Sequence, residues 1–251
     1  MVEVASGHCR IDHVMGMPVV VDVRDDGHAE VVEAVFDWLR FVDATFSTNK
    51  DDSEISRINR GVLKLTDADP CVREVLVRCD ELHDETRGYF DVRFGGGEEV
   101  DPSGFVKGWS IDRAAAILDD AGVRNYAINA GGDLVLRGAD LPDAAWRVGI
   151  QHPRVPDAVA AVIEVTDLTV ATTGEYRRGR HVLNPHTSRP PRGVLSVTIT
   201  GPKLGTADAY ATAAFAMGAA GPHWTARLRG YEAMTVLADE RVLSTPGFPE
   251  H

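Results

Sequence analysis

The sequence has no long hydrophobic run and few cysteines. Its first sixteen residues include charged and polar side chains and no signal-peptide core, and no later stretch is long enough to span a bilayer. The three cysteines show no CxxC spacing and so favour neither a disulfide framework nor a zinc site. They are Cys9, Cys71 and Cys79. We therefore expect a cytoplasmic protein without a membrane span.

Positive charge is also scarce. The chain carries 26 Lys and Arg against 38 Asp and Glu, a net charge of −12. Nucleic acids and anionic membranes bind basic surfaces, so neither is an expected partner. An anionic small substrate would instead need a metal ion or a few well-placed cations. The GxGxxG and Walker patterns are absent, which excludes the two best-known glycine-rich phosphate motifs.

The 251 residues have an ordinary globular composition, with 44% hydrophobic residues and no repeats. Helical periodicity predicts helices over 28–46, at 54–59 with Ser53 as cap, and from Asp69-Pro70 to Gly88. Strands are expected at 11–24 (interrupted at 15–18), 62–65, 89–93, 146–150, 160–165, 168–172, 194–200 and 233–237. With a helix from Thr206 and a short one at 224–228, and no convincing linker, this predicts an α+β domain.

The stretch 100–136 combines an acidic turn, a helix and a glycine-paired strand. Ser103 is predicted to cap a helix that begins near Gly104, and an apolar stripe follows at helical spacing. Lys107 then lies in the first turn, where a positive charge opposes the helix dipole. It is therefore either solvated or bound to an anion.

A second helix, predicted to start at Thr206, has a face of small residues that allows close packing. Asp208 and Thr212 are four residues apart on one face of it. Asp208 can complement the helix dipole while Thr212 returns a hydrogen bond to the backbone.

Three segments, in order along the chain, resemble motifs of the ApbE family of FAD:protein FMN transferases. The first is Asp101-x-x-Gly104-x-x-Lys107-Gly108 with Asp112, followed by Asn129-Ala130-Gly131-Gly132-Asp133. The second is Thr173-Gly174-Glu175-Tyr176, followed by His181-Val182-Leu183-x-Pro185-x-Thr187. The third is Ala207-Asp208-Ala209-x-Ala211-Thr212. The resemblance implies one T-fold-like α+β domain over 1–251, with mixed or antiparallel sheets packed with helices.

The resemblance also implies a ligand set. Magnesium would be held by Asp208, Thr212 and the backbone carbonyl of Gly104. FAD would lie against Met15, Phe90, Asp91, Val92, Asp101, Lys107, Thr173 and Gly174. Of these, Lys107 would then face an anionic ligand, which resolves the choice that its position in the helix leaves open.

The implied reaction moves the FMN phosphoryl group of FAD to a threonine or serine hydroxyl of an acceptor flavoprotein and releases AMP. His181 is the candidate base, with His186 as a competitor, and Asp208 is the second catalytic candidate. Two alternatives remain: a FAD pyrophosphatase, which would carry the same metal site, and a catalytically silent flavin-binding protein.

The chain departs from the family pattern in four places. Asn49 stands where an aromatic residue commonly stacks near the adenine, and Asn184 replaces a usual aspartate. Ser188-Arg189 follows Thr187 in place of a glycine. The segment between Val92 and Asp101 is also shorter than usual, which could open the FAD site or favour water as the acceptor.

Overall fold

The computed structural model describes residues 7–93, 97, 99–141, 144–155, 157–174 and 182–249. Its centre is an eight-stranded sheet in the order β1-β2-β3-β4-β7-β8-β9-β10, in which every neighbouring pair is antiparallel. The strands are β1 His8–Val14, β2 Met17–Val23, β3 Tyr126–Ala130, β4 Asp133–Arg137, β7 Leu168–Gly174, β8 Val194–Gly201, β9 Glu232–Leu237 and β10 Val242–Ser244.

A separate two-stranded sheet pairs β5 Trp146–Gln151 with β6 Val159–Val165. The helices are α1 Ala29–Phe46, α2 Glu54–Asn59, α3 Pro70–Glu85, α4 Ser103–Asp120, α5 Leu204–Ala216 and α6 Gly221–Thr225. Two short 3₁₀ turns are η1 Leu65–Asp67 and η2 Gly218–Ala220. The expectation of one α+β fold with antiparallel sheets packed with helices is confirmed.

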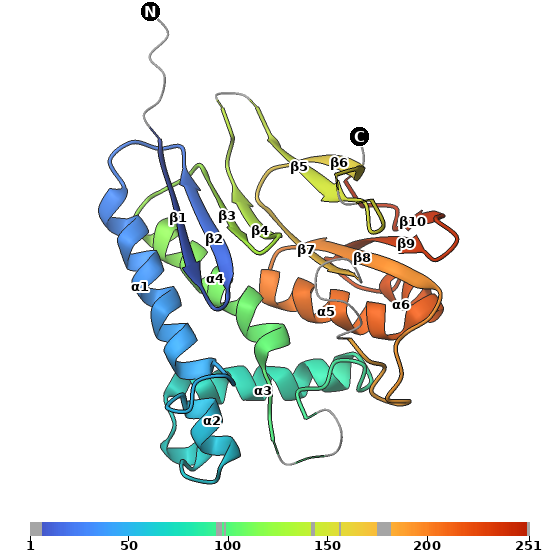
Figure 1. The fold of residues 1–251 in the computed structure, drawn as a ribbon. Coiled ribbons are helices and arrows are strands. Elements are labelled where there is room, and N and C mark those ends of the chain that lie inside the picture. The colour runs from blue at the N-terminus through green and yellow to red at the C-terminus, as the bar shows by residue number, and fades with distance from the viewer. Residues whose placement is uncertain are drawn as a thin grey trace, which may run out of the picture.

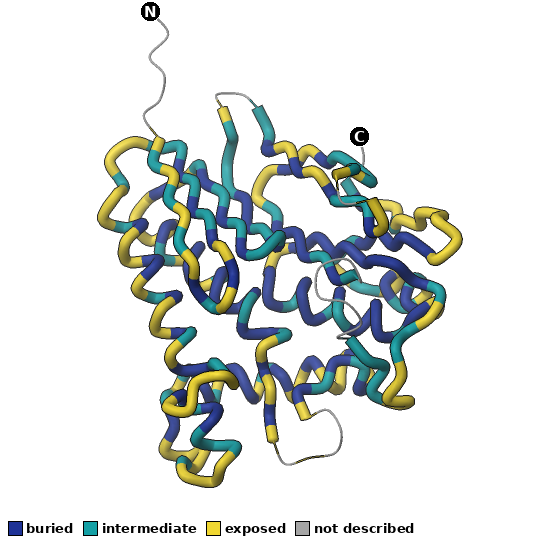
Figure 2. Tube along the Cα trace, viewed as in Figure 1, coloured by how far each residue is buried: buried dark blue, intermediate teal, exposed yellow. Residues whose placement is uncertain are grey.

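Three buried clusters hold the fold together. One buried cluster joins α1, α4 and α5 to one face of the large sheet, and a smaller one packs β5 and β6 on the opposite face. A further cluster lies between α3, α2 and the start of α4, away from the sheet. Figure 1 shows α4 and α5 meeting beside the middle strands, and Figure 2 shows that both helices are mostly buried there.

The hairpin at the start of the chain differs from one interrupted strand. Met15 and Gly16 both have positive φ, 54° and 72°, and form a tight turn that lets β1 and β2 pair in register. Pro18 is accepted within β2, paired with His13. The turn therefore places Met15 at a hairpin tip rather than inside a strand.

Two predicted strands are wrong. Residues 62–65 form no strand but lead into η1, and Val62 stays 66% exposed with no sheet beside it. Residues 89–93 form none either, because their backbone is tied to the end of α3: the amide of Phe90 donates to Thr86 Oγ1 at 2.9 Å. In both places, residues that favour strands have no neighbouring strand to pair with.

Three helix starts also differ. Asp101 Oδ1 accepts the Ser103 amide at 3.0 Å, so Pro102 is the cap residue of α4 and Ser103 is its first helical residue. Helix α5 begins at Leu204 rather than Thr206. Helix α6 occupies Gly221–Thr225 rather than 224–228, with a proline in its first turn.

Strand β7 joins the large sheet and leaves β6 to pair with β5 alone.

Candidate functional site

Helices α4 and α5 touch through glycines. A Cβ on Gly108 would lie 2.7 Å from the Cα of Gly205, and one on Gly205 would lie 2.9 Å from the backbone nitrogen of Trp109. No larger residue fits at either position without moving a backbone. This close approach brings side chains of the two helices within reach of one another.

Asp112 fixes the same contact by hydrogen bonds. Its two carboxylate oxygens accept the amides of Leu204 and Gly205, at 2.8 and 2.9 Å. These are first-turn amides of α5, which have no partner within their own helix. Burial raises the pKa of Asp112, although the two amides act in the opposite direction. The start of α5 is thus capped from α4.

Lys107 lies between two buried carboxylates. Its Nζ forms ion pairs with Asp133 of β4 and with Asp208 of α5, the latter at 3.3 Å. The side chains of Asp133 and Asp208 are 3% and 5% exposed, and that of Lys107 is 26% exposed. Burial lowers the pKa of Lys107, but attraction to the two carboxylates exceeds this effect and raises it above the ordinary lysine value. Lys107 is therefore charged at neutral pH.

Asp133 is a site residue that the sequence prediction did not include. It is the first residue of β4, and its Oδ1 accepts the amide of Thr172 in β7 at 3.0 Å. The alternation of side chains along the strand could have indicated this, because Asp133 and Val135 are two residues apart and both lie on the buried face. A carboxylate on a buried face requires a partner, and here the partner is Lys107.

A pair of hydroxyls lies next to this cluster. Thr173 Oγ1 of β7 is 3.3 Å from Thr212 Oγ1 of α5. Thr212 follows Asp208 by one helical turn, so α5 presents a carboxylate and a hydroxyl on one side. Gly174 ends β7 and pairs with Ser196 of β8. The structure thus brings together Lys107, Asp208, Thr212 and Thr173 from among the residues predicted from the sequence.

Met15 reaches the same region from the hairpin tip. Ser110 Oγ lies 3.7 Å from Met15 Sδ and donates to the carbonyl of Lys107 at 2.7 Å. Met15 is half-buried against both the sheet cluster and the cluster around α3.

The other predicted flavin contacts gather at the start of α4. A Cβ on Gly104 would lie 3.3 Å from the Phe90 ring, and the carbonyl of Val92 accepts the amide of Asp101 at 2.8 Å. The side chain of Asp91 instead accepts the amide of Arg93, at 2.8 Å.

Asn59 holds this approach in place, and the sequence prediction gave it no role. It donates to and accepts from the backbone of Val100, both at 2.9 Å. The segment that leads into Asp101 is therefore fixed from α2.

His181 lies outside the described residues, so its role as base stays a prediction. His186 is described, and its Nε2 is 3.1 Å from the carbonyl oxygen of Arg87. Its ring packs edge-on against Tyr89, with centroids 4.6 Å apart. These contacts tie His186 to the turn after α3.

The donor set suits a hard divalent cation. Two buried carboxylates and the Thr212 hydroxyl supply oxygen ligands of the kind that Mg²⁺ prefers, and two negative charges converge on one ammonium. Within the described ranges, no three His, Cys, Asp or Glu side chains form a metal-binding group. A metal here would therefore need hydroxyl, carbonyl, water or phosphate ligands as well. The Gly104 carbonyl, in the first turn of α4, stays a predicted ligand.

The fold and this site define an α+β domain whose sheet and two helices enclose a lysine, two carboxylates and two hydroxyls. The model of the ApbE family matches residues 15–97 and 93–235, and the chain belongs to that family.

Curated relatives carry one common name. A FAD:protein FMN transferase of Vibrio cholerae is 36% identical over 129 residues, which is 47% of this chain and 39% of that protein. One of Haemophilus influenzae is 26% identical over 275 aligned positions, covering 81% of this chain and 79% of that protein. The match to the Escherichia coli enzyme spans 37% of its length.

Solved structures agree on the fold. The ApbE flavin transferase of V. cholerae superposes with a TM-score of 0.84 at 23% identity, covering 97% of this chain and 98% of that one. The ApbE protein of Thermotoga maritima gives 0.86 at 23% identity, with the same coverage. Among the described residues, no helix combines the length and the apolar character that a membrane crossing requires.

Proposed function

We propose that the chain is a magnesium-dependent FAD:protein FMN transferase, formed by a single domain over residues 1–251 and acting in the cytoplasm. The observation that supports this most directly is the contact of Lys107 with Asp133 and Asp208 beside Thr212. Family membership and the shared name of the relatives support the same reaction.

In this reaction an acceptor hydroxyl attacks the FMN-side phosphorus of the FAD pyrophosphate. A new O–P bond forms, the bond from that phosphorus to the bridging oxygen breaks, and AMP leaves with that oxygen. The hydroxyl proton passes to a base, for which His181 is the candidate. Such a displacement depends mainly on positioning and charge neutralisation.

The described residues would meet this demand by positioning a metal ion. Asp133 holds Lys107 in place from β4, and because two carboxylates surround this one ammonium, the cluster itself is not a source of net positive charge. Asp208, Thr212 and the carbonyl of Gly104 would hold Mg²⁺, which would neutralise the pyrophosphate charge. The proposed FAD contacts are Met15, Phe90, Asp91, Val92, Asp101, Lys107, Thr173 and Gly174.

Incubation with FAD and Mg²⁺, with and without an acceptor flavoprotein, tests the reaction. AMP release that requires the acceptor, together with FMN bound covalently to it, is the expected result. Release without any acceptor would instead mean a FAD pyrophosphatase. No release under either condition would leave a silent flavin-binding protein.

The variant Asp208→Ala tests the site itself. We expect it to abolish AMP release while the circular dichroism spectrum stays native, because one carboxylate ligand is lost and Lys107 keeps Asp133. The exposed Asp239→Ala, far from this site in the sheet order, is the matched control. An active Asp208→Ala enzyme would contradict the metal assignment.

A further inference from the structure

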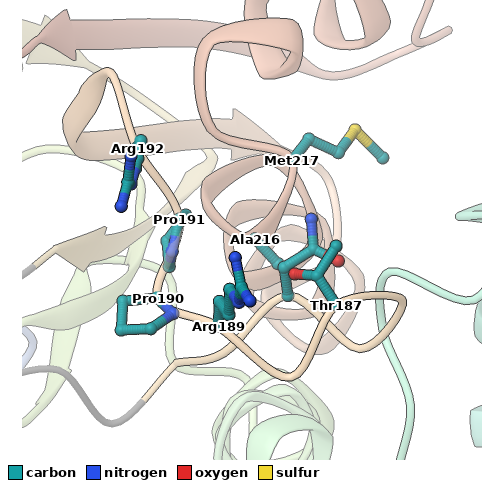
Figure 3. A pocket seen from close by; sticks show the side chains of 8 residues that line it. Thr187, Arg189, Pro190, Pro191, Arg192, Ala216 and Met217 are labelled. Carbon is teal, nitrogen blue, oxygen red and sulfur yellow. The ribbon is translucent and has the colours of Figure 1, made fainter.

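A cavity of about 550 Å³ lies at the end of α5, outside the cluster around Lys107. Its lining includes Thr187, Arg189, Arg192 and Met217. Figure 3 shows Thr187 and Arg189 beside Ala216, with Arg192 on the segment that leads to β8. We call it the arginine pocket.

The walls of the arginine pocket are held by the backbone. Asn184 accepts the amides of Thr187 and Ser188, at 3.1 and 2.8 Å, and donates to the carbonyl of Arg189 at 2.8 Å. The carbonyl of Arg192 accepts the amide of Ala219 at 3.0 Å. A Cβ on Gly218 would lie 2.5 Å from that carbonyl oxygen. These contacts hold the backbone of the lining in place.

Its charge is opposite to that of the whole chain, which is −12. The described lining contains two arginines and no acid. Within the described ranges, neither Arg189 nor Arg192 makes an ion pair within 4.0 Å, whereas Arg40, Arg78 and others do. Both side chains are exposed. Two neighbouring guanidinium groups with no carboxylate partner among the described residues can bind an anion, and arginine pairs best with planar carboxylates or with phosphates.

The lining also argues against a nucleotide. The described lining has no aromatic ring, so adenine or a flavin ring would have only the two guanidinium planes to stack on. Prolines 190 and 191 provide apolar surface without backbone donors. A peptide that carries carboxylate side chains fits this mixture better.

The position of the pocket relates it to the proposed reaction. Asp208, Thr212 and Ala216 follow one another at intervals of one turn along α5. At about 1.5 Å per residue, the pocket lies roughly 12 Å along the helix from Asp208. An extended peptide covers that length in about four residues.

We propose that the arginine pocket binds acidic side chains of the acceptor protein, in the segment that flanks the hydroxyl to be modified. This rests on the proposed transferase function. Arg189 and Arg192 then determine which acceptors are used, while the cluster around Lys107 serves FAD.

Equilibrium binding without FAD tests the pocket independently of catalysis. Two fluorescein-labelled twelve-residue peptides share a central threonine and differ only in carrying aspartate or lysine at alternate positions. By fluorescence anisotropy with the full chain, at low ionic strength, the aspartate peptide should bind at least about tenfold more tightly. Salt should weaken it.

The double variant Arg189→Glu with Arg192→Glu should reverse this preference and bind the lysine peptide. Because an unfolded acidic chain could also attract the lysine peptide, the circular dichroism spectrum of the double variant must stay native. Arg229→Glu is the matched control, an exposed arginine outside the pocket that is expected to keep the wild-type preference. An unchanged preference in the double variant, no preference in the wild type, or displacement by AMP more readily than by unlabelled aspartate peptide would each overturn the proposal.

Transfer assays distinguish a failure of the proposed transferase function from a failure of the pocket assignment. If the arginines select the acidic peptide but no acceptor receives FMN and no AMP is released, the proposed function fails and the pocket assignment stands. If FMN is transferred equally well by the wild type and the double variant, the pocket assignment fails and the function stands.

Discussion

Replacing Lys107 by methionine removes the cation between two buried carboxylates. At 3.3 Å and an effective dielectric constant of about 20, attraction to Asp208 alone corresponds to about 5 kcal/mol before the cost of desolvation. Breaking one side of a buried ion pair typically costs about 3–5 kcal/mol, because an uncompensated charge remains. We expect Lys107→Met to lose about that much unfolding free energy near neutral pH.

The loss should depend on pH in a defined direction. The direction follows from the pKa of Lys107 in the wild type. In the wild type the pKa of Lys107 is raised. Its stabilising effect is therefore present below about pH 10.4, the unfolded lysine value, and is lost as the pH rises through the folded value.

Urea unfolding and melting followed by circular dichroism measure these differences. For a chain of this size, the loss corresponds to roughly 10 °C in melting temperature at neutral pH. Mg²⁺ should restore part of it, because a divalent cation can occupy the place between the carboxylates. Lys64→Met, an exposed lysine, is the control. A loss below about 1 kcal/mol at pH 8 refutes this reasoning.

Two further variants test the contact between α4 and α5. Gly108→Ala should cost about 1–3 kcal/mol in urea unfolding and lower kcat, because its Cβ meets the backbone of α5 at 2.7 Å. Gly149→Ala, whose Cβ has ordinary contacts at 3.6 Å, should change little. Asp112→Ala should cost about 1–3 kcal/mol by leaving two amides of α5 without acceptors. Asp112→Asn, which keeps one acceptor oxygen, should lose less, and equal losses would contradict the capping role.

The sequence predicted the elements whose signals are local. Helix α1 follows from an amphipathic pattern over 28–46, and the Ser53 cap of α2 is confirmed by its 3.0 Å bond from the amide of Ser56. The predicted strand at 62–65 was wrong, because strand propensity at Val62 finds no neighbouring strand to pair with. The side chain of either Asp101 or Ser103 could cap the start of α4, and the sequence alone does not show which one does.

The site was predictable only in part, because its contacts join distant segments. Motif resemblance brought Lys107, Asp208 and Thr212 together, and the structure places the lysine against the aspartate. The sequence showed Asp133 only as the last residue of a glycine-paired motif. Its role in the site depends on an ion pair with Lys107, which comes from another element. Asp112 caps a helix that begins about ninety residues later, which no local pattern indicates.

The order of Lys107, Asp133 and Asp208 along the chain has a consequence for synthesis on the ribosome. Lys107 and Asp133 emerge close together, with α4, β3 and β4, and can pair as soon as those elements form. Asp208, with the glycine contact and the cap that fix its helix, emerges only after β7 and β8 have been made. A nascent chain therefore holds its lysine neutralised by one early carboxylate, and the second carboxylate completes the site in one of the last steps of folding.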